Sequence, residues 1–166
     1  MKPVTLNQLQ EVVKCGGRLL GMDVGVRNVG FAMSDHECRV ASPHSVIYRS
    51  QSTTLSNIVL LDDLVRKHSI RGLVVGYPLE LAGHRSNQEL MVKSFISELQ
   101  LSGRFQNLPY LYWDERLTTA AVTRTLSGLQ MIGHQRKTIL DKMSALGILQ
   151  DCMDNLWRLD RDASQC

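Results

Sequence analysis

The residues best suited to chemistry are four acids at three separate places in the chain. They are Asp23, the adjacent pair Asp114 and Glu115, and Asp141. Mg²⁺ prefers oxygen ligands and keeps several waters, so a few carboxylates and the phosphate oxygens of a substrate complete its coordination. Two such ions about 4 Å apart activate a water and stabilise the leaving oxygen of a phosphodiester. We therefore predict a Mg²⁺ (or Mn²⁺) site drawn from these four acids, with Asp23, Glu115 and Asp141 catalytic.

Asp23 lies in an apolar segment, residues 18–24, that is typical of a buried strand. An acid is disfavoured inside a strand and is rarely fully buried without a partner. Gly25 permits a tight turn and leaves room for a ligand, and a second apolar strand returns over residues 29–33. The alternative is a hairpin in which the Asp23 carboxylate only bonds its own turn.

The acidic pair follows a predicted buried strand over residues 108–113, and ligands of open α/β sheets bind outside the carboxyl ends of strands. Side chains alternate along a strand, so Asp114 and Glu115 are not both expected to point inward. We favour Glu115 as the catalytic acid, with Asp114 orienting Arg116 or capping the next helix. The opposite assignment remains open, as does a solvated loop with a helix cap at Thr118.

Asp141 lies in the strongest predicted helix, which covers residues 137–157 and could begin near His134. One helical face carries apolar side chains: Ile139, Met143, Leu146, Met153 and Trp157. A second stripe joins Asp141 to small and apolar side chains: Ala145, Ile148 and Cys152. An acid at the head of such a stripe must be paired, hydrogen-bonded or metal-bound. The alternative is an exposed first helical turn, where the helix dipole favours an acid.

The order of the predicted elements indicates a mixed α/β sheet. A third strand over residues 40–49, interrupted at Pro43, completes an antiparallel meander with the first two. Predicted helices over residues 53–68 and 86–101 then alternate with strands over 71–77 and 108–113, which implies right-handed parallel crossovers. We predict a five-stranded sheet in the order 3-2-1-4-5, flanked by helices, with the first strand central.

Two further helices are predicted outside this alternation. Thr5 could cap a short helix through Lys14, and another begins at Thr118 or Thr119. The free backbone N–H groups at the start of that second helix suit a phosphate.

Composition allows one intracellular domain that contacts nucleic acid. The 166 residues and net charge of +3 permit nucleic-acid binding without being diagnostic of it. Four scattered cysteines form no Cys-x-x-Cys pair, which disfavours zinc and favours a reducing compartment. With no segment of membrane-spanning length, we expect a soluble, cytoplasmic protein without a membrane partner. The candidate nucleic-acid contacts are Arg27, His84, Arg85, Arg116, Thr118, Thr119, Arg136 and Lys137.

Four segments together resemble the YqgF/RuvX family of Holliday-junction-resolvase-like and pre-ribosomal-RNA nucleases. These segments are Leu20–Gly25 with Arg27 and Gly30, Val74–Leu79 with Gly83, Asp114–Thr119, and Asp141–Leu149. The resemblance covers residues 18–156 and implies an RNase H-like fold. The chain departs from the family pattern in the length before the first strand, in His84-Arg85-Ser86 after Gly83, and at Asn28, where a basic residue is common.

The resemblance implies a metal-dependent endonuclease that hydrolyses phosphodiester bonds in precursor ribosomal RNA or a branched DNA junction. We divide the chain into an N-terminal helical extension (residues 1–17), an RNase H-like nuclease domain (18–158) and a C-terminal tail (159–166), and a homodimer is possible. One alternative is a noncatalytic RNA- or ribosome-binding module on the same fold. An ATP-binding fold of the actin and sugar-kinase type is disfavoured, because it needs a duplicated second domain.

Overall fold

Strands that carry apolar side chains on both faces form the centre of the molecule. The computed structural model describes residues 1–49, 54–78, 86–114 and 133–163. Within them β2 (Arg18–Val24), β3 (Asn28–Ser34) and β5 (Ile70–Tyr77) are buried along most of their length. Strands buried on both faces require helices on both sides of the sheet.

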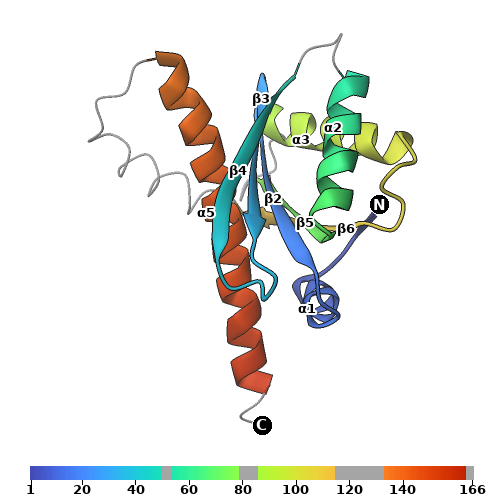
Figure 1. The fold of residues 1–166 in the computed structure, drawn as a ribbon, viewed down its shortest axis with the longest axis vertical. Coiled ribbons are helices and arrows are strands. Elements are labelled where there is room, and N and C mark those ends of the chain that lie inside the picture. Colours follow the sequence, from blue (N-terminus) through green and yellow to red (C-terminus); the bar gives the residue numbers. More distant parts are fainter. Residues whose placement is uncertain (50–53, 79–85, 115–132, 164–166) are drawn as a thin grey trace.

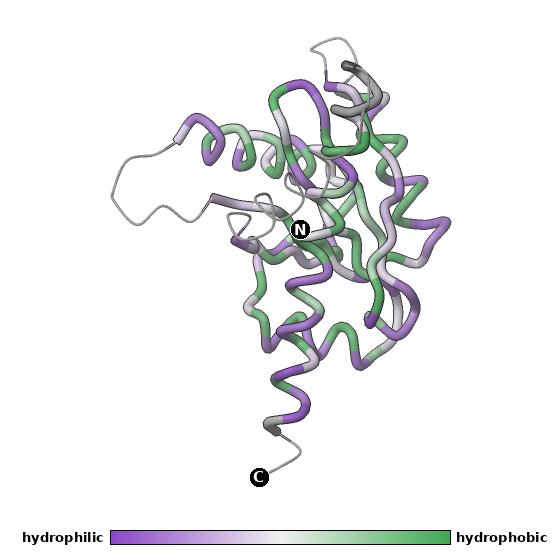
Figure 2. The backbone as a smooth tube through the Cα atoms, turned by 90° about the vertical axis from the view of Figure 1, so that its left-hand side faces the viewer, coloured by the Kyte–Doolittle hydropathy of each residue, from purple (hydrophilic) through white to green (hydrophobic). Residues whose placement is uncertain are grey.

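Helices cover the two faces unequally. α5 (Gly133–Ala163) runs along one side of the sheet, and α2 (Thr54–Lys67) and α3 (Asn87–Leu101) lie on the other (Figure 1). The last turns of α5 extend beyond the body of the molecule and carry mostly hydrophilic residues (Figure 2). None of the helices in the described part of the chain has the length and apolar content needed to cross a membrane.

The sheet has six strands in the order β1-β6-β5-β2-β3-β4. β2, β3 and β4 (Ala41–Tyr48) form the predicted antiparallel meander, and β5 and β6 (Pro109–Asp114) continue the sheet parallel to β2. These five strands have the predicted order. The predicted strand number is wrong, because β1 (Lys2–Pro3) adds a short parallel edge strand beside β6.

The predicted interruption at Pro43 takes a different form. β4 continues through Pro43, and the irregularity is a register shift opposite it, between Gly30 and Ala32 of β3. Proline is tolerated here because β4 is an edge strand, where the missing N–H faces away from the ladder.

The predicted N-terminal helix is confirmed as α1 (Leu6–Lys14). The Thr5 hydroxyl accepts from the Gln8 backbone N–H, while the Gln8 side chain accepts from the Thr5 backbone N–H. This reciprocal pair satisfies two donors at the helix start. Leu9 of α1 is fully buried in the apolar cluster between the sheet and α5.

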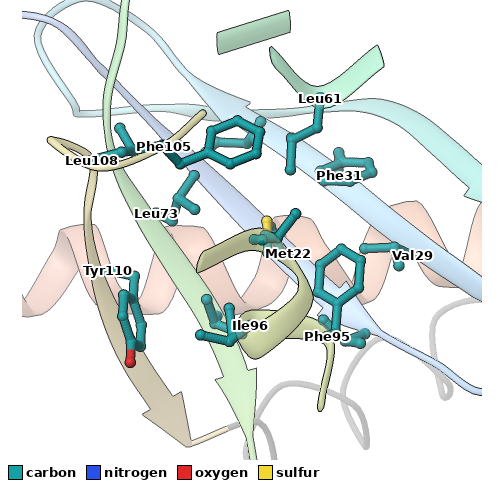
Figure 3. Packing of buried hydrophobic residues seen from close by; sticks show 14 of the residues in the cluster. Met22, Val29, Phe31, Leu61, Leu73, Phe95, Ile96, Phe105, Leu108 and Tyr110 are labelled. Carbon is teal, nitrogen blue, oxygen red and sulfur yellow. The ribbon is translucent and has the colours of Figure 1, made fainter. Parts of the chain in front are cut away.

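The face that carries α2 and α3 has the larger cluster of buried apolar side chains. Met22, Phe31 and Leu73 project from neighbouring strands toward Phe95 and Ile96 of α3 (Figure 3). Because these strand residues alternate with those that face α5, one sheet supplies two separate apolar layers.

Two glycines allow α5 to lie directly on β2 and β3. A Cβ at Gly30 would overlap the backbone carbonyl of Asp141. A Cβ at Gly21 would lie 2.6 Å from the Leu149 Cβ and 2.8 Å from the Ala145 carbonyl oxygen. The second predicted stripe of the helix therefore packs on the sheet, and its members Ala145, Ile148 and Cys152 are each at most 1% exposed. Leu149, beside that stripe, and Met153, from the first predicted face, are fully buried in the same cluster.

We expect Gly30→Ala to lower the free energy of unfolding by about 2 kcal/mol or more, since the new methyl group must push α5 away from β3. Urea denaturation followed by circular dichroism measures the loss. Gly25→Ala is the matched control, because its Cβ would lie 3.0 Å from a single carbonyl oxygen, that of Asn28. Equal stability of the two variants would contradict the close contact of α5 with Gly30.

Candidate active site

Asp23 lies near the end of β2, next to the β2–β3 turn, on the α5 side of the sheet. Asp23 pairs directly with Gly30 across the two antiparallel strands, so the two positions project to the same face. Gly30 is the position that contacts the backbone of Asp141. The fold therefore brings Asp23 and Asp141, two of the predicted catalytic acids, to one end of the sheet.

Asp141 is held by a hydrogen bond that the sequence did not reveal. The side-chain amide of Asn28 donates to Oδ2 of Asp141 over 2.6 Å. Asn28 is 7% exposed, so this bond to a charged acceptor forms in a partly buried setting. The alternative of an exposed first turn is wrong, because α5 begins at Gly133, more than two turns before Asp141.

In the sequence, Asn28 differs from the basic residue that is common at this position of the family that the chain resembles. The available signal was its spacing, because it precedes Gly30 by two positions and so shares the face toward α5. Without knowledge that α5 lies on that face, a polar residue at a strand end is equally compatible with a solvated turn.

Hydrogen bonds within the β2–β3 turn and from other parts of the chain fix its conformation. The Gly25 N–H donates to the Asn28 carbonyl over 2.8 Å. The Arg49 guanidinium donates to the Gly25 carbonyl over 3.2 Å, and the Gln88 amide donates to the Val24 carbonyl over 2.9 Å. Arg27, a predicted nucleic-acid contact, is exposed at this turn.

Asp114 lies on the other side of the sheet from Asp23. It ends β6 opposite Tyr77, and it alternates with Trp113, whose neighbours belong to the α5 face. Tyr112, two residues earlier, packs against the cluster under α2 and α3. The described structure thus does not bring Asp114 together with Asp23, and its assignment as a metal ligand stays a prediction.

Several predicted site residues fall outside the described part of the chain. They are Glu115, Arg116, Thr118, Thr119, His84 and Arg85, together with the predicted short helix after Thr118. Arg136 and Lys137 belong to α5, but the description does not extend to their side chains.

The donor set at the hairpin end is made of oxygen ligands. Within the described residues no group of three or more His, Cys, Asp or Glu side chains is placed to hold one metal ion. Asp23 and Asp141 supply two carboxylates, which are the ligand type that Mg²⁺ and Mn²⁺ select. The described residues therefore supply two of the four predicted acids, Asp23 and Asp141, at this end of the sheet.

A pair of histidines lies at the β4 edge of the sheet. The ring centroids of His44 on β4 and His68 after α2 are 5.3 Å apart in a T-shaped arrangement. Burial lowers the pKa of His44, and the charges of His68, Lys142 and Lys67 lower it further. Three groups that can carry positive charge thus oppose protonation of His44.

Comparison with known proteins identifies relatives along nearly the whole chain. Residues 17–155 match the family described as RuvX, Holliday junction resolvase. A "Putative pre-16S rRNA nuclease" of Paramagnetospirillum magneticum is 39% identical over 138 residues, which is 83% of this chain and 86% of the relative. A protein of the same name in Zymomonas mobilis is 38% identical over 154 residues, 93% of this chain and 91% of the relative.

Solved structures show the same fold at low sequence identity. Thermus thermophilus RuvC in complex with a Holliday junction substrate matches 84% of this chain and 96% of its own, with a TM-score of 0.53 and 10% identity. The yeast mitochondrial Holliday junction resolvase Ydc2 matches 96% and 90%, with a TM-score of 0.52 and 11% identity. These likenesses confirm the predicted RNase H-like fold.

We expect the stability of the protein to fall as the pH drops below about 6.5, in part because of His44. The folded state favours neutral His44, so the unfolded chain takes up this proton first. The contribution is fully present above the ordinary pKa and is lost as the pH falls through the lower folded value. Melting temperatures between pH 7.5 and 5 measure it.

His44→Gln should flatten this pH dependence, whereas His36→Gln, which changes an exposed imidazole, serves as the control. A pH dependence that is the same in His44→Gln and the unmodified protein would show that His44 does not contribute.

Proposed function

Because the chain belongs to the RuvX family of Holliday junction resolvases, we propose that it hydrolyses phosphodiester bonds in structured nucleic acid with the help of Mg²⁺ or Mn²⁺. The names of its relatives and family suggest two substrates, precursor 16S ribosomal RNA and a branched DNA junction.

The convergence of Asp23 and Asp141 on one face of the hairpin end is the observation that carries this proposal. The two acids come from elements far apart in the sequence, and a glycine permits their approach. A carboxylate at the carboxyl end of central strand β2 and a second carboxylate from α5 at the same end of the sheet repel each other unless a cation or a substrate neutralises them.

Asp23 and Asp141 would hold a divalent ion, and Glu115 is the proposed third acid. Strand alternation in the sequence supports Glu115, since Asp114 lies on the face opposite to Asp23. When bound, the ion supplies charge that activates a water and stabilises the leaving oxygen. The Asn28 amide orients the Asp141 carboxylate and leaves its other oxygen for the site.

Basic groups around this end would position the phosphate backbone. Arg27 is exposed at the turn that follows Asp23, within the β2–β3 hairpin. The remaining contacts are proposed from the sequence alone: Arg116, Thr118, Thr119, His84, Arg85, Arg136 and Lys137. Phosphate contacts fix the register of a nucleic acid and do not select its sequence.

A panel of labelled substrates tests the proposal. The purified protein is incubated with Mg²⁺ or Mn²⁺ and precursor ribosomal RNA, four-way DNA junctions and unbranched duplexes. Cleavage of a structured substrate supports a nuclease. Tight binding with no cleavage at any metal concentration would instead support the noncatalytic RNA- or ribosome-binding module.

Asp23→Asn and Asp141→Asn should each lower the rate of metal-dependent cleavage by roughly 100-fold or more, beyond the loss expected for a residue that only supports a ligand. The amide keeps the side-chain volume and removes the charge. Without metal, Asp23→Asn should melt at an equal or higher temperature, because repulsion between carboxylates is relieved. Asp63→Asn, on the exposed side of α2, is the control. Near-normal cleavage by both site variants would rule out these acids.

Arg27→Ala should weaken substrate binding with little sequence preference and reduce the slope of log affinity against log salt by about one unit. Removal of one phosphate contact releases one fewer counterion on binding. Fluorescence anisotropy at several salt concentrations, without a divalent ion, measures the slope. Arg158→Ala removes an exposed charge near the far end of α5 and is the matched control. A slope unchanged by Arg27→Ala would exclude the phosphate contact.

A further inference from the structure

β4 is an outer strand of the sheet, and α5 and α2 lie on either side of it (Figure 1). The Tyr48 hydroxyl lies 3.5 Å from the Thr138 hydroxyl of α5, while the Ala41 N–H donates to the Gln150 side chain over 2.8 Å. α5 therefore runs along β4 in the opposite direction. Lys142 follows Thr138 by about one helical turn, so it belongs to the helical face that Thr138 turns toward β4.

Groups that can carry positive charge meet at this edge from three parts of the chain. The ring centroids of His44 on β4 and His68, directly after α2, are 5.3 Å apart. Burial lowers the pKa of His44, and Lys142 and Lys67, the last residue of α2, lie close enough for their charges to lower it further. We refer to His44, His68, Lys67 and Lys142 as the cationic edge.

The positive charge of the cationic edge is not neutralised by carboxylates of the described residues. Elsewhere in the structure, ion pairs join a carboxylate to Lys14, Arg39, Arg49, Arg66, Lys93 and Arg104. None of the four members of the cationic edge has such a partner within residues 1–49, 54–78, 86–114 and 133–163. Asp63 precedes Lys67 by about one helical turn, but no ion pair joins the two in this described part. An uncompensated cluster of cations attracts an anionic partner.

The cationic edge continues toward the acids through Arg27. The Arg27 carbonyl accepts from the Arg49 N–H over 2.7 Å, which places this exposed residue at the end of β4. From Tyr48, near that end, to His44 the strand covers about 13 Å. This length matches roughly four base-pair steps of a duplex. Arg27 and the cationic edge thus form a row of positive groups that leads away from the hairpin end carrying Asp23.

A phosphate backbone is the anionic partner that fits this row. An acidic peptide added to β4 as a further strand is disfavoured, because Pro43 lacks an N–H and the ladder shifts its register opposite it. Phosphates require only contacts with cations and no regular ladder. We propose that the cationic edge binds the phosphate backbone of the nucleic-acid substrate to one side of the cleaved bond, an inference that rests on the proposed function. The substrate must therefore extend along β4 beyond the bond that is cleaved.

Fluorescence anisotropy of the full chain tests the inference without a divalent ion and hence without cleavage. The probes are a labelled RNA hairpin and a four-way DNA junction, and the one that binds more tightly is titrated at several salt concentrations. Lys67→Gln and Lys142→Gln should each reduce the slope of log affinity against log salt by about one unit, because each removes one phosphate contact. Lys2→Gln removes an exposed cation from β1, at the opposite edge of the sheet, and should leave the slope unchanged.

Slopes unchanged in both Lys67→Gln and Lys142→Gln would overturn the proposal. An equal reduction in Lys2→Gln would also overturn it, since the attraction would then come from net charge and not from this edge. A labelled polyglutamate peptide provides the remaining arm. Loss of affinity for the peptide, with nucleic-acid binding unchanged, would assign the edge to an acidic protein and would again overturn the proposal.

Nuclear magnetic resonance of the imidazole protons gives a second measurement, which a purely structural role would not affect. A bound phosphate stabilises protonated imidazole, so saturation with the nucleic acid should raise the pKa of His44 by roughly one pH unit. The signal of His36, exposed in the turn between β3 and β4, is the control and should not change on binding. A pKa of His44 that is the same with and without nucleic acid would contradict contact at this edge.

The outcome is separable from the nuclease assignment. Reduced slopes in a protein that cleaves no substrate would support the cationic edge and contradict the proposed function. Cleavage by a protein whose slopes are unchanged in the lysine variants would support the proposed function and overturn the inference.

Discussion

The direct contact of α5 with the sheet is the constraint on which the rest of the structure depends. Helices usually pack on sheets through layers of side chains, but here Gly21 and Gly30 bring strand backbone against helix backbone. The same contact buries the small and apolar stripe of α5 and places the Asp141 carboxylate within hydrogen-bond distance of Asn28. A side chain at either glycine would separate the helix from the hairpin, so the packing of the core and the geometry of the acids cannot vary independently.

Much of this arrangement could be predicted from the sequence because alternation and helical spacing are local patterns. They identified the central strands, the order of five of them, and the stripe that carries Asp141. The edge strand β1 could not be predicted, because two residues are too few to show alternation. The bond from Asn28 to Asp141 spans 113 positions, and neither residue type indicates it without the tertiary contact. Strand alternation predicts that Asp114 and Glu115 do not both point inward, but it does not decide which acid of the pair serves the site.

The two faces of the sheet carry different chemistry at the same end. On the α5 side, the Asn28 amide bonds the Asp141 carboxylate near Asp23. On the other side, a pocket between β3, α2 and α3 has apolar walls, and Arg49, Asn57 and Glu98 are also among its lining residues. The short β2–β3 turn separates them. Arg49, which follows β4, donates to the Gly25 carbonyl, and Gln88 of α3 donates to the Val24 carbonyl. Because these hydrogen bonds hold the turn, the turn fixes the distance between the two surfaces.

Both edges of the sheet are poor templates for further pairing. β1 presents two residues, one of which is Pro3, and β4 includes Pro43 with a register shift opposite it. Proline and irregular register are devices by which sheet proteins avoid edge-to-edge aggregation. Growth of the sheet through added strands is therefore disfavoured at these two edges of the described sheet. The same property protects a protein with many buried β-branched and aromatic strand residues when its concentration in a cell rises.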